Sequence, residues 1–527
     1  KMAADGGNAE ALVALGDAYM TGPLVGKDEA AAVDAYERAA ELGNAQAMIK
    51  LADAYTRGIG VDADASKAAE WQKRAAESGD PTGLALTADQ LGAEGKYSEA
   101  LELYEKAADA GSAHSMYKLG FFYRLGLGVE RDLNRAIDYF ERAVELDNTD
   151  AMVALGSAYE FGIGAEQDIA RALELYQRAA DGGNGDGFYQ LGLAYQAGRG
   201  GTPPDDAKAL EAFRKAADLG SIGGTYEVGY YTYFGKETAE DEPAAKVLFE
   251  MAAAGGSDDA MKMLGDMALR ASQNPEARQW YEKAIAYFNT EAMTSLGRIY
   301  DNGTGVAEDN AKAIELYKQA ADAGDPDGMS YMGMMYQYGD GVEASYSTAV
   351  EWYLKAYNAT GADDDAMNLA EAYAGLEDYG NAMRYYRIAA DNGDTAAMIA
   401  VGRLYQNAEG VERSPEAAHS WYQKASDAGD EEGDYEVGED YYFGYGVAED
   451  KERGYDLLWQ SLMRYSLSAL YDGQDLLADN RDLCRAMQKR LKENGFYDGA
   501  IDGSCGPQSI AAWEAASEKA SEDYLAN

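Results

Sequence analysis

Apolar and polar residues alternate along most of the chain with the period of an α-helix. In "NAQAMIKLADAYTRG" the residues Met48, Leu51, Ala52 and Tyr55 are spaced i, i+3, i+4 and i+7, so they lie on one face of a helix. Gly58 follows at the position where a left-handed C-cap would end such a helix. This segment therefore predicts an amphipathic helix that ends near residue 58.

A second helix is predicted after a short polar loop. In "ASKAAEWQKRAAESG" an apolar face is formed by Ala68, Trp71, Ala75 and Ala76, and Gly79 ends it. Small residues on both helices favour a close approach of the two. The two segments together predict a helical hairpin.

The same hairpin pattern recurs thirteen times. Its reference position is the small residue in "ALGDAY", and successive copies lie 32 to 37 residues apart. One hairpin cannot bury its apolar faces alone, so neighbouring hairpins must stack. We therefore expect an all-α chain, a right-handed α-solenoid of about 26 helices in thirteen antiparallel pairs over residues 1–464. The reference residues are Gly16, Ala52, Ala88, Gly120, Gly156, Gly192, Gly229, Gly265, Gly297, Gly333, Ala370, Gly402 and Gly438.

Most units share a longer motif. It reads approximately A-M-x-x-L-G-x-x-Y-x-x-G-x-G-V and closes with W/L-Y-x-x-A-A-x-x-G. The pattern resembles the Sel1-like repeat, a relative of the tetratricopeptide repeat with a longer, glycine-bearing loop. The units around Ala88, Gly265 and Ala370 lack the G-x-G-V insertion, so tighter turns are expected there.

Charge limits the kind of partner. The 527 residues include 93 Asp and Glu against 45 Lys and Arg, a formal net charge of -48. Nucleic acids and anionic lipid surfaces bind through basic side chains, so neither is expected as a partner. Solubility is the simpler explanation of the acidity, and an acidic surface that recruits a basic partner is the alternative. No apolar run approaches the roughly 18 residues of a membrane-spanning helix, so no transmembrane segment is expected.

Catalytic and metal-binding chemistry is not indicated. His114 and His419 lie in different units, pair with no cysteine and have no metal-ligand spacing. Asp132, Asp168 and Asp309 precede second helices, where carboxylates cap free backbone N–H groups, and calcium binding is the weaker interpretation. We predict no cofactor, no metal and no enzyme activity.

Aromatic residues crowd the first helix of three units, where most units have a single tyrosine. The segments are "YEVGYYTYFG" at 226–235, "YMGMMYQY" at 331–338 and "YEVGEDYYFGYG" at 435–446. Exposed rings would suit a protein partner, whereas full burial would indicate local repacking. The candidate partner-binding residues are Tyr230, Tyr233, Phe234, Tyr331, Tyr338, Tyr442 and Phe443.

The stretch "LCRAMQKRLKENGFYDGAIDGSCGPQS", residues 483–509, departs from the repeats. Leu483, Met487 and Leu491 form one helix face, Gly495 ends that helix and Pro507 begins the next. The order of its glycines, Ile-Asp-Gly and Gly-Pro resembles the small helical peptidoglycan-binding domain of many bacterial cell-wall hydrolases and envelope proteins. We assign residues 465–527 to this domain.

The resemblance implies a shallow glycan site on this domain. Its candidate residues are Arg490, Tyr497, Asp498, Asp502 and Ser504, which offer a ring and polar groups for sugar hydroxyls and amides. Turn formation is the alternative role of the two aspartates. Basic residues are dense here, which offsets the overall acidity for an anionic wall; they are Arg481, Arg485, Lys489, Arg490 and Lys492.

Both cysteines of the chain lie in this segment. Cys484 and Cys505 are 21 residues apart, and a disulfide closing such a loop would stabilise the domain by roughly 3 kcal/mol. A disulfide would also indicate an oxidising compartment.

These features predict a non-catalytic scaffold in the periplasm or envelope of a bacterium. Its solenoid would bind other envelope proteins, and its terminal domain would bind peptidoglycan; similar arrays resemble the periplasmic portions of polarity scaffolds. The alternative is a regulator of a cell-wall hydrolase or of exopolysaccharide synthesis and export. The segment "KMAADGGNAEA" matches the end of a second helix, so we expect the natural protein to extend upstream of Lys1.

Overall fold

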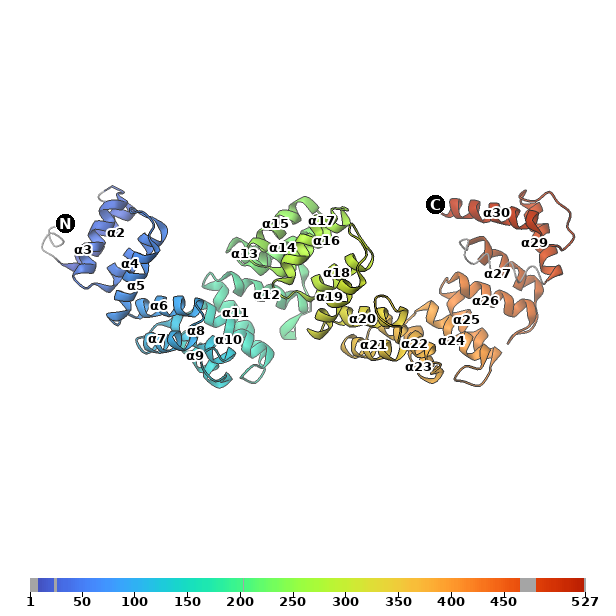
Figure 1. The fold of residues 1–527 in the computed structure, drawn as a ribbon, viewed down its shortest axis with the longest axis horizontal. Helices are drawn as coiled ribbons and strands as arrows, with labels where there is room; N and C mark the ends of the chain where they lie inside the picture. Colours follow the sequence, from blue (N-terminus) through green and yellow to red (C-terminus); the bar gives the residue numbers. More distant parts are fainter. Residues whose placement is uncertain (1–7, 23–25, 202, 465–479, 526–527) are drawn as a thin grey trace. The chain divides into compact units, whose positions relative to one another are not determined.

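The chain is all-α in its computed structural model. The structure describes residues 8–22, 26–201, 203–464 and 480–525, and in these ranges it contains 28 α-helices and no strand. The expected start inside a repeat concerns residues 1–7, which lie outside the described residues. The predicted all-α solenoid is confirmed, since helices α2 to α27 form thirteen consecutive pairs (Figure 1).

Each pair consists of an even-numbered first helix and an odd-numbered second helix. The first helices are α2 (Ala9–Thr21), α4 (Ala45–Arg57), α6 (Pro81–Ala93), α8 (Ala113–Leu125), α10 (Thr149–Phe161), α12 (Gly185–Ala197), α14 (Ile222–Tyr233), α16 (Asp258–Arg270), α18 (Thr290–Asp301), α20 (Pro326–Tyr338), α22 (Asp363–Gly375), α24 (Thr395–Asn407) and α26 (Glu431–Phe443). The second helices are α3 (Glu29–Glu41), α5 (Ala65–Glu77), α7 (Tyr97–Asp109), α9 (Leu133–Glu145), α11 (Ile169–Asp181), α13 (Asp206–Asp218), α15 (Glu242–Ala254), α17 (Asn274–Ile285), α19 (Asn310–Asp322), α21 (Tyr346–Thr360), α23 (Tyr379–Asp391), α25 (Pro415–Asp427) and α27 (Lys451–Arg464). A 3₁₀ turn, η1 (Arg199–Gly201), follows α12.

Side-chain caps fix where many of these helices begin. Asp132, Asp168 and Asp309 each accept a hydrogen bond from the backbone N–H three residues ahead, so the predicted capping role is confirmed. At the other end of α4, Gly58 takes the left-handed conformation with φ 68°. The capping residues in the local sequence therefore fix where these helices begin and end, independently of the packing between helices.

In most pairs the small reference residue of the first helix leaves room for an aromatic ring of the second helix. We call this residue the seat and the ring that packs on it the seat ring. A Cβ atom built on Gly156 would lie 2.6 Å from Cε1 of Tyr176, well inside van der Waals contact. The Tyr176 ring is buried, and its hydroxyl donates a hydrogen bond to Glu160 over 2.7 Å. The sequence suggested that small residues let two backbones approach; in the structure they admit an aromatic ring.

This ring and seat recur in eleven of the thirteen pairs. Nine of the seats are glycines, at which a Cβ would lie 2.3 to 2.9 Å from the ring. The two pairs without a ring have Gln72 and Leu458 at the position. The rings, all buried, are Tyr36, Tyr104, Phe140, Tyr176, Phe213, Phe249, Tyr281, Tyr317, Tyr353, Tyr386 and Tyr422.

Three pairs have short turns, as the missing G-x-G-V insertion predicts. The turns span residues 94–96, 271–273 and 376–378, whereas residues 58–64 join α4 to α5. Tyr104 follows its seat, Ala88, by 16 residues instead of the 20 that separate Gly156 from Tyr176. The turn is thus shortened without moving the ring out of its seat.

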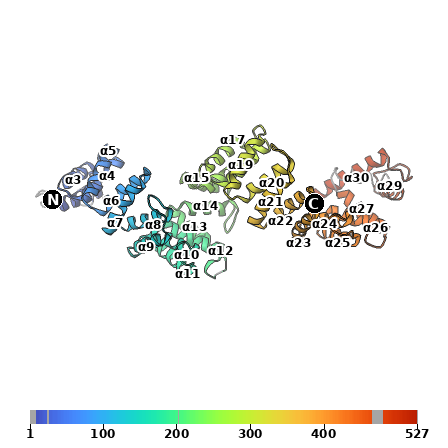
Figure 2. The ribbon, with the colours of Figure 1, turned by 60° about the horizontal axis from the view of Figure 1, so that its bottom comes forward.

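Neighbouring pairs are joined by apolar contacts and by polar side chains at the N-caps of the first helices. Thr294 donates to Asp325 over 2.6 Å, and Thr395 donates to Asp430 over the same distance. The chain divides into two compact units, Lys1–Leu264 and Gly265–Asn527. Within each unit the pairs lie side by side in sequence order (Figure 1, Figure 2).

Replacing a seat glycine should destabilise the fold although alanine is the better helix former. We expect Gly156→Ala to lower the stability of its unit by about 1–3 kcal/mol, because the new methyl group displaces Tyr176. The measurement is the urea unfolding midpoint followed by circular dichroism. Gly92→Ala in α6 is the matched control, since its Cβ would meet nothing closer than 3.8 Å and helix propensity should then add up to about 1 kcal/mol. Equal unfolding midpoints for the two variants would contradict the conclusion that Gly156 makes room for the ring of Tyr176.

Candidate functional site

The terminal segment forms a lobe that packs on the last helix pair. Its two helices are α29 (Arg481–Glu493) and α30 (Pro507–Leu525), and both contact α27. Tyr442 and Leu458 of the last pair share one buried cluster with Leu483 and Trp513 of the lobe. The lobe therefore covers the apolar face that a further repeat would otherwise cover.

The predicted disulfide is present in this lobe. Cys484 of α29 is bonded to Cys505, which lies just before α30, with 5.7 Å between their Cα atoms. Cys484 is fully buried. The bond ties the first turn of α29 to the end of the glycine-rich turn, residues 494–506.

Gln488 organises the glycine-rich turn from inside. Its Nε2 donates hydrogen bonds to the side chain of Asp502 and the carbonyl oxygen of Ser504, each over 3.0 Å, and to Ser509 over 3.1 Å. Its Oε1 accepts from the backbone N–H of Gly503. Gln488 is fully buried, so one amide contacts three groups of the turn and Ser509 at the start of α30.

The five candidate peptidoglycan-binding residues do not form one exposed group. Tyr497 is buried, with its hydroxyl donating to the carbonyl of Ala500, and Arg490 forms an ion pair with Asp456 of α27 over 2.6 Å. Asp498, Asp502 and Ser504 are exposed on the turn. Arg490 and Tyr497 thus have structural contacts, while three polar residues face the solvent.

Asp502 has the turn-forming contacts that the alternative role of the aspartates predicts. Its carboxylate accepts from Gln488 and from the backbone N–H of Ser504, and these hydrogen bonds hold its pKa below the usual range. Its exposure leaves the carboxylate free to take further hydrogen bonds.

The aromatic cluster of the last pair is not exposed as predicted. Tyr442 is 5% exposed and Phe443 is half-buried, because both pack in the cluster that the terminal lobe shares with α27. The Tyr442 hydroxyl donates to the side chain of Asn480, directly before α29. The exposure prediction is therefore wrong for Tyr442, whose ring helps to seat the lobe.

The other two aromatic clusters are divided between core and surface. Tyr233 is also buried, contrary to prediction, because it packs edge-on against Phe249, the seat ring of its pair. Tyr230 is half-buried, and its ring contacts the tilted ring of Phe234, whose side chain is half exposed.

The third cluster shows the same division. Tyr331 stacks on the seat ring Tyr317, whereas Tyr338 is largely exposed. Partner binding by the exposed rings stays a prediction.

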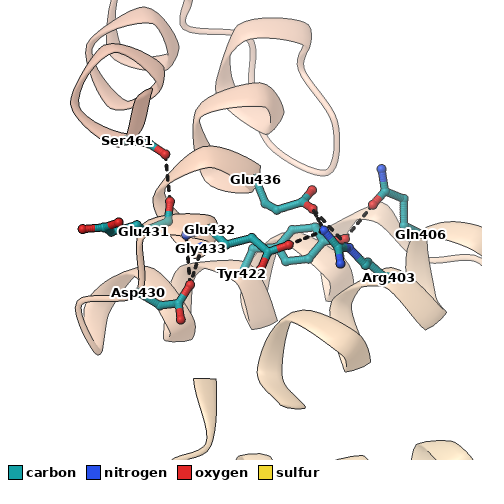
Figure 3. Close-up of polar contacts among 9 residues, drawn as sticks. All are labelled: Arg403, Gln406, Tyr422, Asp430, Glu431, Glu432, Gly433, Glu436 and Ser461. Atoms are coloured by element: carbon teal, nitrogen blue, oxygen red, sulfur yellow. Dashed lines mark hydrogen bonds and ion pairs between the residues drawn. The ribbon is translucent and has the colours of Figure 1, made fainter. Parts of the chain in front are cut away.

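A polar cluster joins the last two repeat pairs (Figure 3). Arg403 of α24 forms ion pairs with Glu432 and Glu436 of α26, the latter over 3.0 Å. Asp430 caps α26 at the N–H groups of Glu432 and Gly433. This arrangement places one cation between two acids of the next helix.

The rest of Figure 3 shows how the cluster is held. Tyr422, a seat ring, donates to Gln406 over 2.6 Å, and Ser461 of α27 donates to the carbonyl of Glu431. Burial raises the pKa of Glu436, an effect that Arg403 opposes.

Further acids of α26 lie in low-dielectric surroundings. Burial, and then the charge of Glu436, raises the pKa of Glu439 to about 7. Asp440 is buried beside His419, whose Nδ1 lies 3.0 Å from its carboxylate, and burial raises the pKa of Asp440. His114, by contrast, is exposed and contacts Asp89, as expected of a surface position.

The sequence analysis missed the roles of Gln488 and Arg403. A signal existed for Gln488, a polar residue adjacent to Met487 on the apolar face of α29. Arg403 lies one residue after the reference Gly402, and such positions face the next pair, as Asp17 also shows by binding Lys50 over 2.9 Å. A comparison of this position across units could have predicted the contact.

Within the described ranges, no three His, Cys, Asp or Glu side chains are grouped so as to hold a metal ion. None of the helices there has the length and apolar character to cross a membrane.

Stacked helical hairpins with polar outer faces define a helical-repeat protein of the kind that binds other proteins. The family model that matches is the Sel1 repeat, and the chain belongs to this family. Such repeats are generally non-catalytic interaction scaffolds. The matched residues are 9–44, 45–80, 88–112, 113–148, 149–184, 189–221, 224–257, 259–286, 290–325, 326–360, 366–394, 395–430 and 432–458.

Among solved structures, the chain is similar to c5321, described as a protective antigen of uropathogenic Escherichia coli strains with an SLR fold. The identity is 26%, the match covers 99% of this chain and 94% of that one, and the TM-score is 0.43. A Sel1 repeat protein from Oxalobacter formigenes is 27% identical over 45% of this chain and 98% of its own, with a TM-score of 0.40. No curated protein matches the chain.

Removing the amide of Gln488 should loosen the terminal turn. In Gln488→Leu the groups of Asp502, Gly503, Ser504 and Ser509 lose their shared partner, at a cost of about 1–3 kcal/mol. We expect the backbone amide of Gly503 to exchange with deuterium at least tenfold faster. Gln508→Ala, which removes an exposed amide that bonds only Asp498, is the control and should leave this rate unchanged. An unchanged rate in Gln488→Leu would show that the disulfide alone holds the turn.

The raised pKa of Glu439 predicts a pH-dependent stability. Glu439 is half-buried, and its folded-state pKa of about 7 lies above the unfolded-state value of 4.5. The stability that its protonated form contributes is therefore full below pH 4.5 and is lost as the pH rises through 7. Glu439→Gln should therefore be more stable than the parent chain at pH 8 by roughly 2 kcal/mol, and nearly equal to it at pH 4.5. Urea unfolding at both pH values measures the difference. Glu452→Gln, at an exposed position of α27, should show no such pH-dependent gain.

Proposed function

We propose that this protein is a non-catalytic scaffold of the bacterial envelope that binds protein partners through its repeats and peptidoglycan through its terminal lobe. The observation that carries the proposal is the pairing of two parts: thirteen stacked Sel1 repeats and a disulfide-closed lobe built against the last of them. Repeats of this kind present extended surfaces to other proteins.

A periplasmic location is supported by the bond between Cys484 and Cys505. Structural disulfides persist in oxidising compartments and are rare in the bacterial cytoplasm. Cys484 is fully buried in the lobe, which suits a structural bond better than a reactive thiol.

Peptidoglycan binding is supported by the outer surface of the glycine-rich turn. Asp498, Asp502 and Ser504 are exposed there, and Ile501 between them is 40% exposed. Hydrogen-bonding groups around one apolar side chain suit the hydroxyls and the apolar face of a sugar. Gln488 and the disulfide hold the backbone of this surface in one conformation, which lowers the entropic cost of binding.

The test is co-sedimentation with purified peptidoglycan sacculi. Deleting the lobe would expose Tyr442 and Leu458, so point substitutions are the better design. We expect Asp498→Ala/Ile501→Ser to weaken binding about tenfold, since both side chains are exposed and neither holds the turn.

The control is Glu493→Ala, an exposed position at the end of α29. It should sediment like the parent chain. If the double variant also sediments unchanged, or if the parent chain does not sediment, the wall-binding part of the proposal is wrong and the lobe acts only as the cover of the last repeat.

A further inference from the structure

The second repeat pair lacks the ring that eleven other pairs place in the seat. Its reference residue is Ala52, and the residue 20 positions later is Gln72, where Gly156 has Tyr176. The other pair without a ring fills the space differently, since Leu458 is fully buried against Gly438.

A cavity of about 420 Å³ lies beside Gln72. It is formed by α4, α5 and the first helix of the next pair, α6. This volume is within the range of ordinary ligand sites. The lining residues are Tyr55, Thr56, Ala63, Ala65, Ala68, Ala69, Gln72 and Gln90.

The cavity lies beside the position that the hydroxyl end of a ring at residue 72 would reach. Thr56, four residues after Ala52, lines the cavity together with Gln72. In three pairs the residue equivalent to Thr56 accepts the hydroxyl of the seat tyrosine; Glu160, Asp301 and Gln406 do so for Tyr176, Tyr317 and Tyr422 respectively. In three other pairs the residue directly after the seat accepts it; Asp17, Asp89 and Asp266 do so for Tyr36, Tyr104 and Tyr281. The hydroxyl of a tyrosine at position 72 would therefore lie near Asp53 and Thr56, at the side of the cavity that Thr56 lines.

The chain's own side chains do not occupy this space. Trp71 packs against the core of the pair and lies under Arg74, whose guanidinium carbon is 4.2 Å from the ring centroid. Among the described residues, the amide of Gln72 has no hydrogen-bond partner. It is thus available to a group that enters the cavity.

We propose that this cavity is a docking site for an aromatic side chain, tyrosine or phenylalanine, of a protein partner. The occupant follows from the chain itself, because the residue equivalent to Gln72, which lines this cavity, is a buried Tyr or Phe in eleven pairs. The lining carries alanine methyl groups, a tyrosine ring and neutral amides and no charged side chain, which suits a ring with at most one hydroxyl. The inference rests on the proposed scaffold function and specifies the chemistry of one contact with a partner.

The test uses 4-fluorophenol as an analogue of the tyrosine side chain, observed by ¹⁹F NMR with the full chain. We expect the probe signal at about 1 mM to broaden with the parent protein, as a fragment of this size binds in the millimolar range. In Ala52→Gly/Gln72→Tyr, which restores the ring and seat of the other pairs, the broadening should fall at least fivefold. Trifluoroethanol, an aliphatic fluorinated alcohol, should not broaden with either protein.

Two further variants make the outcome decisive. Gln177→Tyr adds an exposed tyrosine on α11 away from the cavity and should broaden the probe like the parent chain. Ala69→Phe places a larger side chain in the lining of the cavity and should also reduce the broadening. This single substitution provides the same test if the double variant does not fold. No broadening with the parent chain, or equal broadening with the filled variant, would overturn the proposal.

Failure here is separable from failure of the proposed function. The filled variant leaves the terminal lobe unchanged, so its sedimentation with sacculi should equal that of the parent chain. Probe binding without sedimentation would contradict only the wall-binding proposal, and sedimentation without probe binding would contradict only the docking site.

Discussion

The contact between a seat residue and a buried ring is the constraint on which eleven of the thirteen repeat pairs depend. It fixes the distance between the two helices of a pair, because a Cβ at most seats would overlap the ring. It also fixes their register, since the ring must lie opposite one residue. Turn length is free to vary as long as this register is kept, and the pairs with turns at 94–96, 271–273 and 376–378 use that freedom. A shorter turn between the two helices is therefore compatible with the same packing of ring on seat in the core.

The repeats join their neighbours by polar contacts that vary from pair to pair. Asp17, Asp89 and Arg403 occupy equivalent positions, one residue after the reference residue, and differ in charge. Their partners in the next pair are Lys50, His114 and Glu432 respectively. Since most pairs are already stabilised by the ring and seat, these positions can change without loss of the fold. The surface over the first helices can thus be acidic, basic or aromatic in different units, which is how one architecture presents different partners with different chemistry.

Periodicity predicted the fold because each helix carries its own apolar face, its own cap and its own ending glycine. The disulfide could be predicted because both cysteines fall in one short segment. Exposure of Tyr442 could not, since its burial depends on α29 and α30, which are distant in sequence and follow no repeat. The role of Gln488 depends likewise on a turn that returns to the same helix 14 to 21 residues later. Sequence patterns predict which residues share one face of a helix. The burial of Tyr442 and the role of Gln488 depend instead on contacts with other segments of the lobe.

The attachment of the lobe to α27 has a mechanical consequence. Arg490 pairs with Asp456, the Tyr455 hydroxyl donates to the carbonyl of Ala486, and both contacts lie beside a shared apolar cluster. A pulling force applied to the lobe would therefore be shared between the covalent chain and the side-chain contacts that join the lobe to α27. Tension between a fixed surface and the repeats would be spread over this face, and it would pass to the preceding pair through contacts between pairs such as that of Arg403 with Glu432.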